Sequence, residues 1–146
     1  MSTPEGAPPP SPTFLIMTLG RKLREQVERD LRASGLSLRH LSALGHLSRE
    51  PGLSYSELAR RAGITAQSMQ ATLNQLKTLG AVERTTEAGR GRTARLQVTD
   101  RGEELRTAAQ ATITAADEKL LATIPEEDRA PLTRALVAAF RSPLPE

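Results

Sequence analysis

Residues 54–82, SYSELARRAGITAQSMQATLNQLKTLGAV, have the pattern of two short helices joined by a tight turn. Ser54 and Glu57 form a capping-box pattern before the first helix, and Gly63 supplies the turn. Thr65 can cap the helix that follows. Apolar residues recur along that second helix at a spacing typical of a buried stripe: Met69, Leu73 and Leu76. The stretch therefore predicts a helix-turn-helix.

A change of period follows this unit. After Gly80 the apolar residues alternate, so residues 81–86 and 93–98 are predicted to be the two antiparallel strands of a hairpin. The tip between them includes EAGRGR at residues 87–92, in which two glycines stand among arginines. Taken alone, such a basic tip is also typical of a solvated turn, so its meaning depends on the helices around it.

Helical periodicity also flanks the helix-turn-helix. Four further helices are predicted, at about residues 13–33, 37–50, 100–122 and 125–140. Ser37, Thr99 and Pro125 mark three of the starts. The first of these helices carries an apolar residue at every fourth position: Leu15, Leu19, Leu23, Val27 and Leu31. Residues 1–12, rich in proline and small residues, are predicted to be a disordered tail, and residues 142–146 a short C-terminal tail.

Composition narrows the classes of function. The 146 residues include no cysteine, which excludes disulfides, thiolate metal sites and a cysteine nucleophile. His40 and His46 are interpreted as ordinary helix residues, and no metal site or cofactor is expected. No activated nucleophile and no phosphate-cradling glycine loop is recognisable, so an enzyme is not expected. We expect a cytoplasmic protein without a membrane partner, because the chain lacks a long apolar run and a secretory signal.

The charge and the aromatic content bear on nucleic-acid binding. The formal net charge of +3 permits such binding without requiring it. Only three aromatic residues are present, which argues against folds that stack single-stranded bases on aromatic side chains. If the protein binds nucleic acid, a duplex is the better match.

Three segments carry a resemblance to a known family: LSYSELARRAGIT (53–65), SMQATLNQLKTLGAVERT (68–85) and LQVTDRG (96–102). In order and spacing they resemble the MarR family of bacterial transcriptional regulators, and the resemblance extends over about residues 13–141. It implies a mainly α fold with a small β-hairpin. The winged helix-turn-helix domain would lie at residues 36–99, with its recognition helix at about 65–79 and its wing at about 81–98.

The resemblance also implies an assembly and a ligand. Residues 13–34 and 100–141 would form a helical dimerisation region, which agrees with an apolar surface larger than the small winged domain can cover. Family members bind pseudo-palindromic duplex DNA as homodimers, many as repressors, and become nucleoid-associated when bound. They commonly release DNA when a small phenolic or hydrophobic effector binds. A cysteine-oxidation switch, used by some members, is excluded here.

Candidate DNA-binding residues follow from the motif. Those on the outer face of the second helix or its margins are Thr65, Gln67, Ser68, Gln70, Ala71 and Asn74, with Lys77 as its positive side chain. The candidates in the wing are Arg84, Arg90, Arg92 and Arg95. Glutamine and asparagine pair well with adenine and alanine with the thymine methyl group, so A·T contacts are expected in the major groove. Arginines suit a narrow A·T-rich minor groove.

Two departures from the family pattern affect these assignments. Many members carry a basic residue where this chain has Ala71, so more of the phosphate attraction must come from the wing. The usual wing aspartate is missing, with Glu87 the nearest substitute, and the family's wing arginine aligns with Arg92 or with Arg90.

Two questions stay open at this level. The rival function is a winged helix that mainly binds another protein, for which an apolar patch would be expected on the second helix. An effector pocket could be lined by several residues, although the same residues are better explained as plain core: Leu15, Leu19, Leu44, Leu47 and the two histidines.

Overall fold

The computed structural model describes residues 6, 10–85 and 95–145. Its elements in chain order are α1 (Pro12–Arg32), α2 (Leu38–Arg49), α3 (Tyr55–Ala62), α4 (Ala66–Thr78), β1 (Val82–Arg84), β2 (Leu96–Val98), α5 (Asp100–Ala122) and α6 (Glu126–Arg141). The chain divides into a first unit, residues 1–112, and a second unit, residues 113–146. Helix α5 begins in the first unit and ends in the second. The predicted fold class, mainly α with a small hairpin, is confirmed.

Helix α1 begins one residue earlier than the sequence pattern predicted. The Ser11 hydroxyl accepts a hydrogen bond from the Phe14 amide at 3.3 Å, so Ser11 is the N-cap and Pro12 the first helical residue. Proline fits that position because its nitrogen has no hydrogen to leave unpaired. The C-terminal half of the helix packs inward through Val27 and Leu31, both buried.

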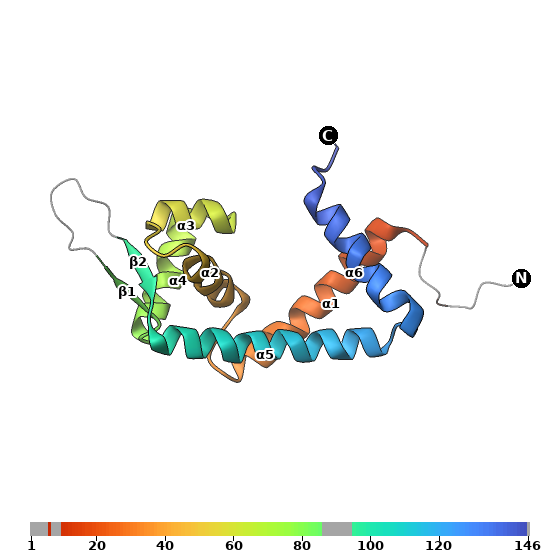
Figure 1. The fold of residues 1–146 in the computed structure, drawn as a ribbon, viewed down its shortest axis with the longest axis horizontal. Helices are drawn as coiled ribbons and strands as arrows, with labels where there is room; N and C mark the ends of the chain where they lie inside the picture. The colour runs from red at the N-terminus through yellow and green to blue at the C-terminus, as the bar shows by residue number, and fades with distance from the viewer. Residues whose placement is uncertain (1–5, 7–9, 86–94, 146) are drawn as a thin grey trace, which may run out of the picture. The chain divides into compact units, whose positions relative to one another are not determined.

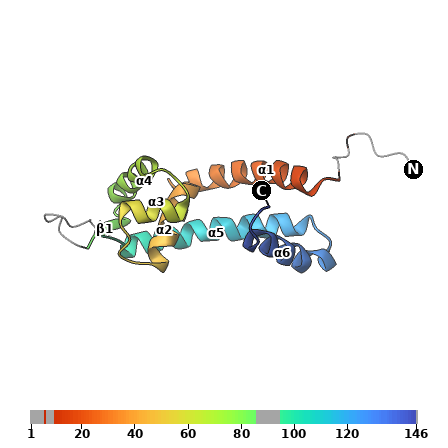
Figure 2. The same ribbon diagram turned by 90° about the horizontal axis from the view of Figure 1, so that it is seen from above.

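The helix-turn-helix forms as predicted. Gly63 ends α3 with φ +68°, a conformation that side chains with a Cβ rarely adopt, and the Thr65 hydroxyl caps α4 by accepting from the Ser68 amide. Helices α2, α3 and α4 pack against one another around one apolar core (Figure 1), and the second view shows the same three helices together (Figure 2). The side chains that fill this core completely include Leu44, Leu47, Leu58, Met69, Leu73 and Leu76.

The reciprocal capping box is found at the start of α2 and not at the start of α3, where the sequence predicted it. The Ser54 hydroxyl accepts from the Glu57 amide, but the Glu57 carboxylate accepts from that same hydroxyl and not from the Ser54 backbone. A reciprocal box instead begins α2: the Ser37 hydroxyl accepts from the His40 amide, and His40 Nδ1 accepts from the Ser37 amide at 3.1 Å. His40 lies in α2, as predicted, and in addition closes this capping box.

Within the described residues, the two strands of the hairpin are shorter than predicted, because residues 81, 85 and 95 belong to neither strand. Strands β1 and β2 pair antiparallel, with Val82 opposite Val98 and Arg84 opposite Leu96. Val82 and Leu96 turn into the core, while the other edge of β2 bonds to the segment before α3 through Gly52, whose amide donates to the Leu96 carbonyl at 2.8 Å. Residues 86–94, which hold the tip, lie outside the described residues.

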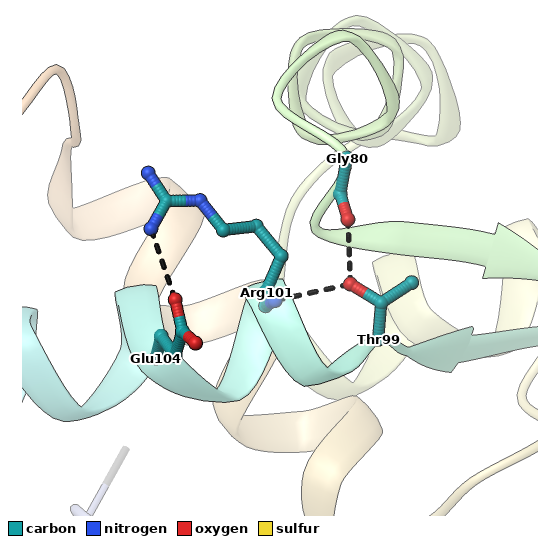
Figure 3. Close-up of polar contacts among 5 residues, drawn as sticks. Gly80, Thr99, Arg101 and Glu104 are labelled. Carbon is teal, nitrogen blue, oxygen red and sulfur yellow. Dashed lines mark hydrogen bonds and ion pairs between the residues drawn. The ribbon is translucent and has the colours of Figure 1, made fainter.

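The junction between the hairpin and α5 is tightly packed. The Thr99 hydroxyl donates to the Gly80 carbonyl at 2.5 Å and accepts from the Gly102 amide at 3.0 Å, so Thr99 caps α5 as predicted (Figure 3). A Cβ at Gly102 would lie 2.1 Å from the Ala81 carbonyl oxygen. The absence of a side chain at Gly102 is thus what lets α5 begin this close to the backbone that leads into β1.

The second unit consists of the end of α5 and helix α6. Pro125, predicted to lie in the first turn of the last helix, is instead the residue just before α6, and Pro131 lies inside that helix. Every residue of α6 is at least partly exposed. The helices enclose an apolar groove of about 470 Å³, whose lining includes Leu120, Leu121, Leu132, Leu136, Val137 and Phe140. Nowhere in the described part of the chain is a helix long and apolar enough to cross a membrane.

Candidate nucleic-acid interface

Helix α4 presents a polar face to solvent. Of the predicted contact residues, most are exposed: Thr65, Gln67, Gln70, Ala71 and Asn74. Ser68 is only partly exposed. The opposite face is anchored by Met69, Leu73 and Leu76, so the rotation of the helix about its own axis is set by the core. The amide side chains are consequently held outward, where they can both donate and accept hydrogen bonds.

Lys77 lies at the end of this face but is not an isolated cation. The side chain is half-buried, and its ammonium donates a hydrogen bond to the hydroxyl of Tyr55, the first residue of α3. Tyr55 is not among the contact residues predicted from the sequence. Its aromatic character one residue after the cap was the only signal, because its partner lies 22 positions away.

Two of the four arginines predicted for the wing lie among the described residues. Arg84 in β1 and Arg95 before β2 are both exposed. The Arg95 guanidinium donates to the Gly52 carbonyl at 3.4 Å. Arg90 and Arg92, together with Glu87, lie outside the described residues, so their placement stays a prediction.

A part-buried polar link joins α2 to α4. Because His40 Nδ1 accepts from the Ser37 amide, the proton of the neutral ring is on Nε2, which donates to Gln75 Oε1 at 2.7 Å. His40 is 8% exposed. The Glu28 carboxylate of α1 accepts from the Leu38 amide at 3.2 Å, which ties α1 to the same end of α2. These bonds link α1 to α2 and α2 to α4.

A second polar network connects α2 to the start of α5. The Glu103 carboxylate accepts from Arg106 Nε at 2.8 Å and from the Ser48 hydroxyl at 2.9 Å. These two hydrogen bonds, that from Arg106 foremost, hold the pKa of Glu103 below its ordinary value. Partial burial, followed by the positive charges of Arg49 and Arg61, lowers the pKa of His46.

A pocket of about 440 Å³ opens in the first unit among α1, α2 and the α3–α4 turn. Its residues combine two arginines and a serine with apolar side chains: Arg24, Leu38, Arg39, Ser42, Ala62, Ile64 and Met69. The residues considered from the sequence as pocket lining do not line it. Leu44 and Leu47 are fully buried in the core, and Leu19 is 48% exposed on α1.

Comparisons with known proteins agree with this arrangement. A family model described as the MarR family matches residues 34–93. The HTH-type transcriptional repressor Rv2887 of Mycobacterium tuberculosis is 39% identical over 111 residues, which is 76% of this chain and 80% of the repressor. The chain belongs to the MarR family. The likeness covers both the helix-turn-helix and most of the flanking helices, so the family membership predicted from sequence is confirmed.

Solved structures of a MarR family protein extend the comparison. The crystal structure of Rv2887 from M. tuberculosis in complex with DNA is 32% identical, covers 92% of this chain and 100% of that chain, and superposes with a TM-score of 0.78. The complex of Rv2887 with salicylic acid is 34% identical, covers 92% and 98% of the two chains, and gives a TM-score of 0.72.

Proposed function

We propose that this MarR family member is a transcriptional repressor that binds pseudo-palindromic duplex DNA as a homodimer. The observation that carries the proposal is the exposed polar face of α4, which a buried apolar stripe holds outward. The chain that presents this face is 39% identical to a named transcriptional repressor. The DNA complex of Rv2887 supports the same mode of action. A regulator of this kind acts in the cytoplasm, at the nucleoid.

The major groove is read by α4. Gln67, Gln70 and Asn74 each offer an amide that can donate to and accept from adenine, and Ala71 offers a methyl group to thymine. The wing supplies charge through Arg84, Arg95 and the arginines of its tip, which enter the adjacent minor groove. Base preference and phosphate attraction are thus divided between α4 and the wing.

Exposed apolar side chains support the homodimer. In the first unit, the N-terminal half of α1 exposes Phe14, Ile16, Met17 and Leu19. In the second unit, Leu136, Val137, Phe140 and Leu144 are exposed, Phe140 to 91%. Surfaces of this kind are costly in water and typical of association sites. A two-fold dimer buries them and presents two α4 helices to half-sites about one DNA turn, ~34–36 Å, apart.

The pocket in the first unit is suited to a small effector. Two arginines, Arg24 and Arg39, line this pocket together with Ile64, Met69 and other apolar side chains. This combination favours a planar aromatic acid, whose carboxylate pairs with arginine while its ring is buried. The salicylic acid complex of Rv2887 supports an effector of that class. Because α4 contributes Met69, a ligand here can alter the position of the DNA-reading helix.

A gel-shift titration against the DNA upstream of the protein's own gene tests the proposal, with a scrambled duplex as the control. Specific retardation is expected, and salicylate should reduce it. With about six phosphate contacts per dimer, the logarithm of the binding constant should fall with log salt at a slope of about 5. Q70A should change the base preference and R92A should flatten the slope. Equal affinity for the scrambled duplex would favour the rival function, a protein-binding winged helix.

A further inference from the structure

The hydrogen bond between Tyr55 and Lys77 has a geometry that leaves donors free for a further partner. The Lys77 nitrogen is 5.0 Å from the centroid of the Tyr55 ring and is also hydrogen-bonded to the hydroxyl at the edge of that ring. A nitrogen that is bonded to the hydroxyl and 5.0 Å from the centroid lies farther from the centroid than the hydroxyl oxygen does. The ammonium therefore lies beyond the hydroxyl and not over the face of the ring.

This position continues the polar face of α4. Gln70, Asn74 and Lys77 are spaced by four and three residues, so they form one row along the helix. Tyr55 extends the row onto the start of α3. Three residues before Tyr55, the Gly52 carbonyl accepts from the Arg95 guanidinium at the base of the wing. Tyr55 and Lys77 thus join the polar face of α4 to the start of α3, three residues along the chain from the contact at the base of the wing.

The chemistry of the two groups suits an anionic oxygen. The Tyr55 hydroxyl accepts from the ammonium, so its own proton is available for donation outward. The ammonium carries three hydrogens, of which this bond uses one. Both side chains are half-buried, and the hydrogen bond to the Tyr55 hydroxyl restricts the positions that the Lys77 ammonium can take. A phosphate oxygen at this position would accept from both groups without the entropy cost of ordering a free lysine.

We propose that Tyr55 and Lys77 form a single phosphate-binding pair that contacts the DNA backbone at the edge of the major groove entered by α4. The inference rests on the proposed function and adds Tyr55 to it as a binding residue. Phosphate contacts of this kind carry no sequence information but fix the register of a protein on the duplex. The pair thereby sets where along the groove Gln70 and Asn74 meet the bases.

The test compares Y55F, K77M and the double variant with the unaltered protein, using fluorescence anisotropy over a salt series. Two duplexes are used, the upstream DNA and a random sequence of equal length, because phosphate contacts do not depend on sequence. The variant K119M, which removes an exposed lysine from α5, is the matched charge control. Urea unfolding of each variant reports separately on the fold.

Loss of Lys77 should lower the magnitude of the salt slope by about 1 per site on both duplexes. Y55F should weaken binding about fivefold, the effect of one hydrogen bond. In the double variant the loss of the hydroxyl should add little to K77M, because the two groups act together. K119M should leave the slope unchanged.

Unchanged DNA affinity of Y55F, with a fall only in unfolding free energy, would overturn the proposal and leave the pair as an internal brace of the helix-turn-helix. An equal loss of slope in K119M would also overturn it. In both cases the unaltered protein still binds DNA, so the proposed function stands. Failure of the unaltered protein to bind either duplex would overturn the proposed function and the phosphate assignment together.

Discussion

Replacing Gly102 with alanine would push a methyl group into the backbone of the segment that enters the hairpin. The new Cβ would lie 2.1 Å from the Ala81 carbonyl oxygen and 2.5 Å from Val98 Cγ1. The valine can change its rotamer, but the carbonyl cannot turn away, because it accepts from the Thr99 amide at 3.0 Å. Helix α5 must therefore move, and the hydrogen bonds of Thr99 across the junction weaken with it.

The size of the effect can be worked from two opposing contributions. Overpacking a core position lowers the unfolding free energy by about 1–3 kcal/mol. Because the added methyl group would meet a backbone oxygen, which moves less easily than a side chain, we expect about 3 kcal/mol here. Alanine returns at most about 1 kcal/mol through its higher helix propensity. The expected net loss in unfolding free energy is about 2 kcal/mol. For a chain of this size that corresponds to a fall of about 6 °C in Tm.

Urea unfolding followed by circular dichroism measures this loss, at one fixed protein concentration because dimer stability depends on concentration. The matched control is G45A in α2, where the added Cβ meets only the flexible Arg49 side chain, at 3.5 Å. G45A should gain up to about 1 kcal/mol. If G102A unfolds at the same urea concentration as the unaltered protein, the close approach of α5 to residue 81 is not a constraint and the reasoning is wrong.

Three further outcomes are expected. T99V, which removes the hydroxyl that caps the Gly102 amide, should lose about 1 kcal/mol of unfolding free energy in urea, whereas T99S should lose much less. H40A should lose about 1–2 kcal/mol of unfolding free energy, because it removes the part-buried link to Gln75 and one half of the α2 capping box, and an unchanged urea midpoint would contradict that role. Acid should reduce stability as the pH falls through the lowered pKa of Glu103, because the unfolded chain takes up that proton first, near its ordinary value of 4.5. Urea midpoints measured from about pH 6 to about pH 3 should therefore decline less steeply in E103Q, and parallel declines would count against the assignment.

The parts of the fold that sequence alone predicted are those that depend on neighbours in the chain. Gly63 and Thr65 mark the turn and the cap because a positive φ and a capping hydroxyl act within a few residues. The apolar stripe of α4 is recognisable because its period is that of the helix itself. Once the buried stripe is known, the remaining residues of α4 must face outward, and they include most of the candidate contact residues.

Tertiary structure decided which distant residues meet. The bond from His40 to Gln75 spans 35 positions and that from Lys77 to Tyr55 spans 22, and no local period records either. The hydrogen-bond partners of His40 were not predicted, because an imidazole in an apolar pattern gives no sign of which groups it will contact. For Gly102, the need for glycine exists only because α5 packs against residue 81. Helices and turns are thus encoded locally, whereas partners across helices depend on how the core brings them together.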